Sequence, residues 1–264
     1  MTPTTWPTED LLRASLPSGV WMEHHEAIDS TNLRAKALAR EGAPHLSLVW
    51  ADTQTAGRGR FDRRFYSPGG VGFYFSLVVR PTCSPEQLSL LTPCAAVAVA
   101  EAIEKTHGVS VGIKWVNDLY LSDKKVAGIL TEAALRPDGA PDYAVIGIGL
   151  NVRRSPLPEE LAATATSLEA ELGGAPLDSA RLAEAIFARL AARLSSFETG
   201  DFLPLYRERS ILDGKTVTVT QGERTLCARV LGIGDRAELL LDAEGEHISL
   251  SSGEVVSLHG TPIL

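Results

Sequence analysis

Apolar and polar residues in the first part of the chain follow two periods, one typical of strands and one typical of helices. Apolar runs predict strands at residues 20–27, 46–51, 73–79, 109–115, 119–121, 125–134 and 143–152. Helical spacing predicts helices at residues 9–15, 31–41, 84–105, 178–199 and 202–209. Pro93 is expected to kink or split the helix at 84–105. The clearest helix is 178–199, with Asp178 as its cap and Gly200 at its end.

The pattern changes after Ser210. From there, short strand-like runs alternate with turns at Asp213-Gly214, Gln221-Gly222, Gly234-Asp235, Glu244-Gly245 and Ser252-Gly253. We therefore predict two domains, a larger one at residues 1–210 and a small β-barrel at residues 211–264. The barrel carries 4 Lys and Arg against 8 Asp and Glu, a balance that disfavours nucleic-acid binding.

Composition narrows the class of protein. The chain has 264 residues and a net charge of −8, which again disfavours nucleic acid as a general partner. Its first residues lack the basic segment and the apolar core of a secretory signal. No apolar run is long enough to span a membrane. Its 3 cysteines are far apart and form no CxxC pair, which argues against a disulfide framework and a zinc site. We expect a cytoplasmic protein with no membrane segment.

Residues 54–76 hold an unusual concentration of positive charge. Arginines occupy positions 58, 60, 63 and 64, glycines flank the first two, and Asp62 is the only acid. Glycine lets the backbone approach an anion closely, and guanidinium groups match phosphate or carboxylate oxygens. Taken alone, the stretch is equally compatible with a solvated basic loop and with a loop that holds phosphate.

Two further features point to binding. Ser30 is predicted to cap the helix at 31–41 with its hydroxyl, and the polar residues 29–32 could grip a neutral urea-like or amide ligand. Gly147 and Gly149 fall on one face of a strand, so another group is expected to pack or bind close to them. Residues 153–167 are rich in proline, threonine and small residues, and we expect a long loop with scope for motion.

Six short motifs follow one another along the chain: Asp29-Ser30-Thr31-Asn32, Gln54-Thr55-Ala56-Gly57-Arg58-Gly59-Arg60, Phe65-Tyr66-Ser67-Pro68, Lys114-Trp115-Val116-Asn117-Asp118, Lys125-Val126-Ala127-Gly128-Ile129-Leu130 and Gly147-Ile148-Gly149-Leu150-Asn151. Each is weak alone, but six in this order form a specific signal. Together they resemble the biotin protein ligases, or biotin–[acetyl-CoA-carboxylase] ligases, over roughly residues 20–260. The chain resembles the monofunctional type, which lacks an N-terminal DNA-binding domain.

The resemblance implies a fold and a reaction. The fold is α+β, with a mixed-sheet catalytic domain of the biotin/lipoate ligase type followed by a small SH3-like β-barrel. The reaction is ATP-dependent protein modification: biotin and MgATP give biotinyl-5′-adenylate and pyrophosphate, and biotin then passes to one lysine of a biotin carboxyl carrier protein or domain. ATP and biotin are thus substrates and Mg2+ a cofactor. Monomer and homodimer are equally compatible with the sequence.

The resemblance also implies roles for residues. It implies catalytic roles for Lys125, Arg60 and Asp118. It implies biotin contacts for Ser30, Thr31, Asn32, Gln54, Gly57, Arg58, Gly59, Arg60, Tyr74, Lys125 and Gly128, and Ser76 adjoins the same pocket. It implies ATP or adenylate contacts for Arg58, Arg60, Arg63, Phe65, Lys114, Asn117, Lys125 and Asn151. Metal ligands are not identified, and Asp118 is left with two roles, orienting the carrier lysine or a metal-bound water.

Several alternatives stay open. Without the resemblance, Lys125 is a surface lysine beside Lys124, and Asn117-Asp118 is turn chemistry. Phe61 and Asp62 depart from the family pattern, and Phe65 takes the place of a tryptophan, where it can still stack on adenine. The rival functions are a lipoate–protein ligase of the same fold, a non-catalytic biotin or nucleotide sensor, and a nucleic-acid binder that uses the arginine stretch.

Overall fold

A computed structural model describes residues 7–61, 63–258 and 261–262. Its centre is a seven-stranded mixed sheet in the order β1-β2-β3-β7-β6-β5-β4. The strands are β1 (Met22–Ile28), β2 (Leu48–Gln54), β3 (Gly72–Val79), β4 (Gly112–Lys114), β5 (Asp118–Leu121), β6 (Lys124–Leu135) and β7 (Pro141–Asn151). Only β1 and β2 pair in parallel, because helix α2 (Thr31–Arg40) forms the crossover between them.

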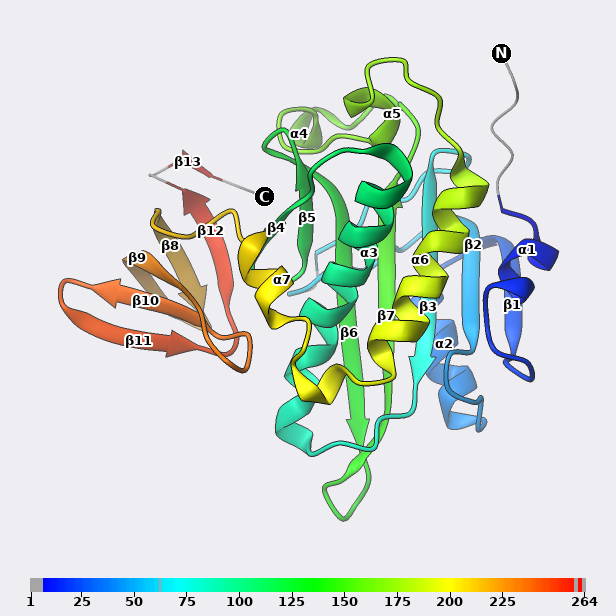
Figure 1. Ribbon diagram of the computed structural model, residues 1–264, viewed down its shortest axis with the longest axis horizontal. Helices are drawn as coiled ribbons and strands as arrows, with labels where there is room; N and C mark the ends of the chain where they lie inside the picture. The colour runs from blue at the N-terminus through cyan, green and yellow to red at the C-terminus, as the bar shows by residue number, and fades with distance from the viewer. Residues whose placement is uncertain (1–6, 62, 259–260, 263–264) are drawn as a thin grey trace.

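Helices cover the two faces of this sheet unequally (Figure 1). The long helices α3 (Leu91–His107) and α6 (Ser179–Leu194) pack on one face, and α2 lies on the other. Alternation along the strands separates the two layers: Leu48 and Leu77 belong to the larger core with α3, whereas Val49 and Val78 pack with α2. Strand β3 is therefore buried on both faces along its whole length.

The long helical segment begins differently from the prediction. It opens as a 3-10 helix η1 (Pro85–Leu90), which Ser84 and Gln87 start with a reciprocal capping box, and it becomes α-helical at Leu91. Pro93 falls in the first turn of α3, where its missing N–H leaves no intrahelical bond unmade. The predicted split thus occurs just before Pro93, as a change of helix type. Within the described chain, Pro85–His107 is one helical stretch apolar enough to cross a membrane by length and composition. However, 67% of its most apolar part is buried in the core.

The remaining helical elements are short. They are α1 (Glu9–Ala14), α4 (Glu159–Ala162), α5 (Leu168–Glu171), η2 (Phe197–Thr199) and α7 (Leu203–Glu208). The helix predicted at 178–199 ends at Leu194, and its last part is the separate turn η2, which ends at Gly200 in the left-handed conformation. Residues 153–167, predicted as a loop, contain α4.

A second sheet lies at one end of the molecule, beside α7 and β4 (Figure 1). Its strands are antiparallel, in the order β11-β10-β9-β8-β12-β13. They are β8 (Thr216–Gln221), β9 (Arg224–Ile233), β10 (Leu239–Ala243), β11 (Glu246–Leu250), β12 (Glu254–Leu258) and β13 (Thr261–Pro262). The indole of Trp115 donates to the Ala237 carbonyl at 2.8 Å and ties the two sheets together. The α+β class with a mixed and an antiparallel sheet is confirmed.

Candidate functional site

The N-terminus of α2 holds two buried hydroxyls beside the end of β2. Ser30 occupies the N-cap position, but its hydroxyl makes no capping hydrogen bond. Gln54 Oε1 instead accepts the Thr31 N–H at 2.9 Å and caps the helix from the neighbouring strand. The prediction that the Ser30 hydroxyl caps α2 is therefore wrong. Within the described chain the Ser30 Oγ is buried without a hydrogen-bond partner, so it is available to a ligand.

A chain of polar side chains continues inward from Thr31. The Ser76 Oγ on β3 lies 2.8 Å from Thr31 Oγ1 and 2.6 Å from Asn32 Oδ1. The Asn32 Nδ2 donates to the Leu130 carbonyl at 3.3 Å and to Glu132 Oε2 at 3.1 Å. These hydroxyl and amide groups are buried, so their mutual hydrogen bonds hold this end of the site in one geometry.

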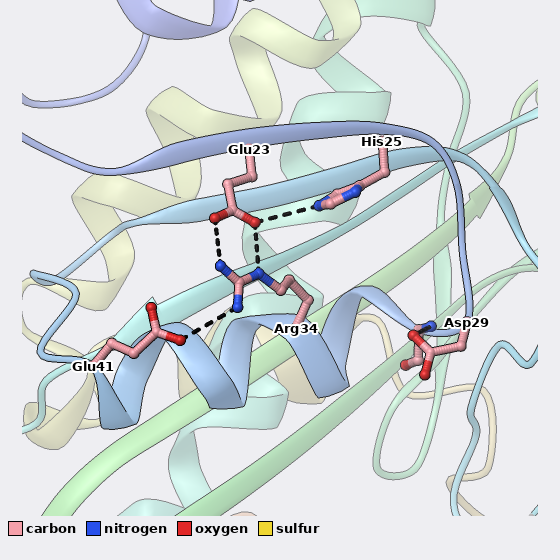
Figure 2. Close-up of polar contacts among 6 residues, drawn as sticks. Glu23, His25, Asp29, Arg34 and Glu41 are labelled. Atoms are coloured by element: carbon pink, nitrogen blue, oxygen red, sulfur yellow. Dashed lines mark hydrogen bonds and ion pairs between the residues drawn. The ribbon is translucent and has the colours of Figure 1, made fainter.

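Figure 2 shows how α2 is fixed to the edge of the sheet. Arg34 on α2 donates from Nε and Nη2 to the two carboxylate oxygens of Glu23 on β1, each at 2.7 Å. Glu41 at the end of the helix and His25 on β1 extend the cluster. The hydrogen bond from Arg34 is the main cause that lowers the pKa of Glu23. This bidentate ion pair between Arg34 and Glu23 holds the helix in place. It thereby also holds the hydroxyls at the helix N-terminus.

Two glycines of strand β7, Gly147 and Gly149, lie beneath the site. A Cβ at Gly147 would overlap the amide of Asn32, and one at Gly149 would overlap the ring of Phe65. On the adjoining β6, a Cβ at Gly128 would come within 3.2 Å of Lys125 Nζ. The expected close approach at these strand glycines is confirmed, and the groups that approach are candidate site residues.

Residues 57–61, 63 and 64, named here the arginine loop, fold back on themselves. The Phe65 N–H donates to the Gly57 carbonyl at 2.9 Å, and the Gly59 N–H donates to the Arg63 carbonyl at 2.7 Å. Gly57 is buried, and a Cβ there would stand 2.5 Å from the Phe65 carbonyl oxygen, so the turn requires glycine. Phe61 is 58% exposed, with the Arg60 guanidinium 4.8 Å from its ring centroid. The predicted effect of Asp62 lies outside the described residues.

The second sheet reaches into the site at the start of β12. Arg60 donates to the Gly253 carbonyl at 2.9 Å and to Asn117 Oδ1 at 3.2 Å. Arg63 forms an ion pair with Glu254 at 2.5 Å. Burial lowers the pKa of Arg60, although a guanidinium stays charged at any physiological pH. Two arginines of the loop are thus anchored to a different sheet from the one that carries the loop.

Two lysines and an aspartate meet at the centre. Lys125 Nζ lies 2.8 Å from Asp118 Oδ1, which also accepts from Asn117 Nδ2 at 3.0 Å. Lys114 is 3% exposed, and its burial lowers its pKa to about 8, against the opposing effect of Asp118. In the described parts of the chain, no three His, Cys, Asp or Glu side chains gather in a way that could hold a metal ion by themselves.

Residues 153–167 close over this centre. The Lys125 N–H donates to the Thr164 carbonyl and the Thr166 N–H donates to the Lys125 carbonyl, both at 2.8 Å. The segment therefore pairs with the start of β6 like a short extra strand. Asn151, at the end of β7, donates to the Thr166 carbonyl at 3.0 Å and fixes the same segment from the other side.

Most of the predicted site residues face one cleft of about 200 Å³. The predicted site residues that line it are Ser30, Thr31, Asn32, Gln54, Arg58, Gly59, Arg60, Arg63, Phe65, Lys114, Asn117, Asp118, Lys125, Gly128 and Asn151. Three predicted residues do not line it. Gly57 is buried at the start of the arginine loop, and Ser76 is fully buried beneath the site. Tyr74 is 1% exposed, donates to the Pro68 carbonyl and borders a neighbouring pocket.

Comparison with known proteins decides the family. The model of the biotin/lipoate A/B protein ligase family matches residues 25–151. The bifunctional ligase/repressor BirA of Bacillus subtilis (strain 168) is 36% identical over 243 residues, which cover 89% of this chain and 74% of that protein. The chain belongs to the biotin protein ligase family. The biotin–[acetyl-CoA-carboxylase] ligase of Mycobacterium tuberculosis is 34% identical over 237 residues, covering 87% of this chain and 86% of that one.

A solved structure supports the same assignment. The biotin protein ligase from Aquifex aeolicus in complex with biotin and ATP superposes with a TM-score of 0.75 and 28% identity. The match covers 90% of this chain and 98% of that one, so it includes both sheets.

Sequence reasoning missed several residues of this ligase site. Glu254 and Val255 line the cleft from the second sheet, and Leu157 and Leu161 line it from the closing segment. Glu132, which holds Asn32, was also missed. Glu132 carries a detectable signal, because it is the one acid in a strand that is mostly apolar after Lys125, whereas nothing local to Glu254 separates it from other barrel acids.

Proposed function

We propose that this chain catalyses the two half-reactions of a biotin protein ligase. Biotin and ATP give biotinyl-5′-AMP and pyrophosphate, and the acyl group then passes to a lysine of a biotin carboxyl carrier domain with release of AMP. The observation that carries the proposal is the Lys125–Asp118 pair at 2.8 Å, in a cleft with neutral hydroxyls at one end and arginines at the other. A neutral ureido ring and a triphosphate need these two opposite environments.

In the first half-reaction a carboxylate oxygen attacks the α-phosphorus, and the bond to the pyrophosphate oxygen breaks. Two anions must therefore be held in contact. Lys125, Lys114 and Arg60 supply cations there, which offset the repulsion and the charge that develops on the phosphate. We assign the hydroxyls of Ser30 and Thr31 to the ureido ring, Arg58 and Arg63 to phosphates, and Phe65 with Asn151 to the adenine.

In the second half-reaction the neutral amine of the carrier lysine attacks the acyl carbon, and AMP leaves. Asp118 is the carboxylate at the centre, and we assign it to orient the incoming amine. The proposal includes Mg2+ as an ion bound to the ATP phosphates. The phosphates and water would supply most of its oxygen ligands, and the protein would supply at most Asp118. This arrangement is common for Mg2+ and suits a site without a carboxylate cluster among the described residues.

The wider setting follows from the same proposal. Carrier domains of carboxylases are the macromolecular partner and the cytoplasm the location, with neither nucleic acid nor a membrane required. We propose that residues 1–210 form the catalytic domain and residues 211–264 the SH3-like barrel, a division that the separate antiparallel sheet supports. The Mycobacterium tuberculosis relative, whose name includes acetyl-CoA carboxylase, supports that class of carrier.

One experiment tests the proposal against its rivals. Purified protein is given ATP, Mg2+ and either biotin or lipoate, pyrophosphate release is followed, and a carrier domain is then examined for a mass gain of one biotin. We expect release and transfer with biotin only. Release with lipoate alone indicates a lipoate ligase, and binding of biotin without pyrophosphate release indicates a sensor.

A further inference from the structure

We propose that Glu132 is a positioning residue that fixes the direction of the hydrogen bonds beneath the N-terminus of α2. As a result, Thr31 acts only as an acceptor toward bound biotin. The inference rests on the proposed function and adds a residue to it. Glu132 lies in the middle of β6, with 23% of its side chain exposed, and does not itself line the cleft. Its effect reaches the ligand through Asn32, Ser76 and Thr31.

The orientation of the Asn32 amide is the first step. Its Nδ2 lies 3.3 Å from the Leu130 carbonyl and 3.1 Å from Glu132 Oε2. Burial tends to raise the pKa of Glu132, but hydrogen bonds from Lys36 and Asn32 outweigh it and leave that pKa below its ordinary value. Both neighbours are therefore acceptors only, and the NH2 group must face them. The Asn32 Oδ1 is left facing Ser76.

The hydroxyl protons follow from this orientation. Ser76 has one hydroxyl proton, and Asn32 Oδ1 at 2.6 Å can only accept it. Thr31 Oγ1, at 2.8 Å from Ser76 Oγ, then receives no proton from Ser76 and can donate its own proton to it. Gln54 Oε1, which accepts the Thr31 N–H, lies 3.1 Å from Thr31 Oγ1 and has a second lone pair that can accept the same hydroxyl proton. Thr31 can thus offer a ligand its lone pairs but no proton.

This polarity matches a ureido ring. Such a ring presents two N–H donors and one carbonyl acceptor. Thr31 accepts from an N–H, and the unpartnered buried hydroxyl of Ser30 is free to donate to the carbonyl. If the amide of Asn32 turned over, Ser76 would donate to Thr31 and would occupy a lone pair that the N–H of the ligand needs.

Calorimetric titration of biotin without ATP tests the effect of Glu132. Glu132→Gln keeps the size of the side chain but adds an NH2 group that favours the turned amide. We expect its Kd for biotin to rise about tenfold or more. Glu101→Gln is the matched control, because Glu101 is a similarly buried partner of Arg193 between α3 and α6. It is expected to bind biotin within about twofold of the unmodified protein.

A ligand analogue separates polarity from general damage. A biotin N-methylated at the ureido ring lacks one N–H and adds the same bulk for every variant. The unmodified protein is expected to lose about tenfold more affinity for this analogue than Glu132→Gln does. Lys36→Met removes the cation at 2.8 Å from Glu132 Oε1 but keeps the acceptor for Asn32, so its biotin affinity should change less than about threefold.

Equal losses for the analogue in both proteins, or unchanged biotin affinity in Glu132→Gln, would overturn the inference. A melting temperature for Glu132→Gln within a few degrees of Glu101→Gln shows that the fold is intact. Unmodified protein that binds no biotin would instead overturn the proposed function, and the two failures are therefore distinct.

Discussion

At the end of the cleft formed by α2 and β2, the polar groups are neutral, buried and hydrogen-bonded to one another. At the other end, the arginine loop carries charged groups that are partly exposed and are anchored to the second sheet through Gly253 and Glu254. The first end offers a fixed set of donors and acceptors to a rigid neutral ring. The second offers charge that can follow a flexible triphosphate. We expect changes at the first end to raise the KM for biotin and changes at the second to raise the KM for ATP.

Lys125 lies between the two ends, and its loss should have the largest effect. Lys125→Ala removes the cation placed where carboxylate and phosphate meet, so adenylate formation should fall about a hundred- to a thousandfold. Pyrophosphate release measures the rate, and circular dichroism checks the fold. Lys124→Ala, a change at the preceding residue of β6, is the control. Near-normal turnover in Lys125→Ala would contradict the role of Lys125 between the two ends of the cleft.

Arg60 tests the charged end alone. Arg60→Ala removes the bonds to Gly253 and Asn117 that hold the loop over the cleft. The closed site protects a hydrolysable anhydride, so the variant should release free biotinyl-adenylate about tenfold or more faster. Filtration of labelled intermediate from the enzyme measures this release. Retention equal to that of the unmodified protein would count against a closing role for Arg60.

The two ends also differed in how well the sequence predicted them. Periodicity predicted the strands of the first sheet, and Gly147 and Gly149 predicted a close approach by some other group. The structure identifies the approaching groups as Asn32 and Phe65. Ser30 was correctly placed at the N-cap, but the partner that caps α2 is Gln54, and a contact between residues so far apart has no local signal. Glu254 was missed for the same reason, because its role depends on how the second sheet packs against the arginine loop.

Glu254 tests whether the second sheet contributes to the charged end. Its carboxylate holds Arg63 at 2.5 Å, although 47% of the Arg63 side chain is exposed, so solvent weakens the pair. Glu254→Gln should raise the KM for ATP about three- to tenfold and leave the KM for biotin unchanged. Glu246→Gln on β11, an exposed acid of the same sheet, is the control. A rise in the KM for biotin instead would show that the two ends are not independent.

The smallest expected effect is a pH dependence at Lys114. Its ordinary pKa of 10.5 falls to about 8 because the folded protein buries it, so Lys114 is a cation below pH 8 and loses its proton as the pH rises through that value. If it serves the phosphates, kcat/KM for ATP should fall about threefold between pH 7 and pH 9, since this parameter reports groups of the free enzyme. The kcat/KM for biotin should not follow the same curve. Lys114→Arg keeps its charge across this range, so its ATP profile should be flat where the unmodified profile falls. A fall that persists unchanged in Lys114→Arg would assign the titration to another group and remove Lys114 from the charged end.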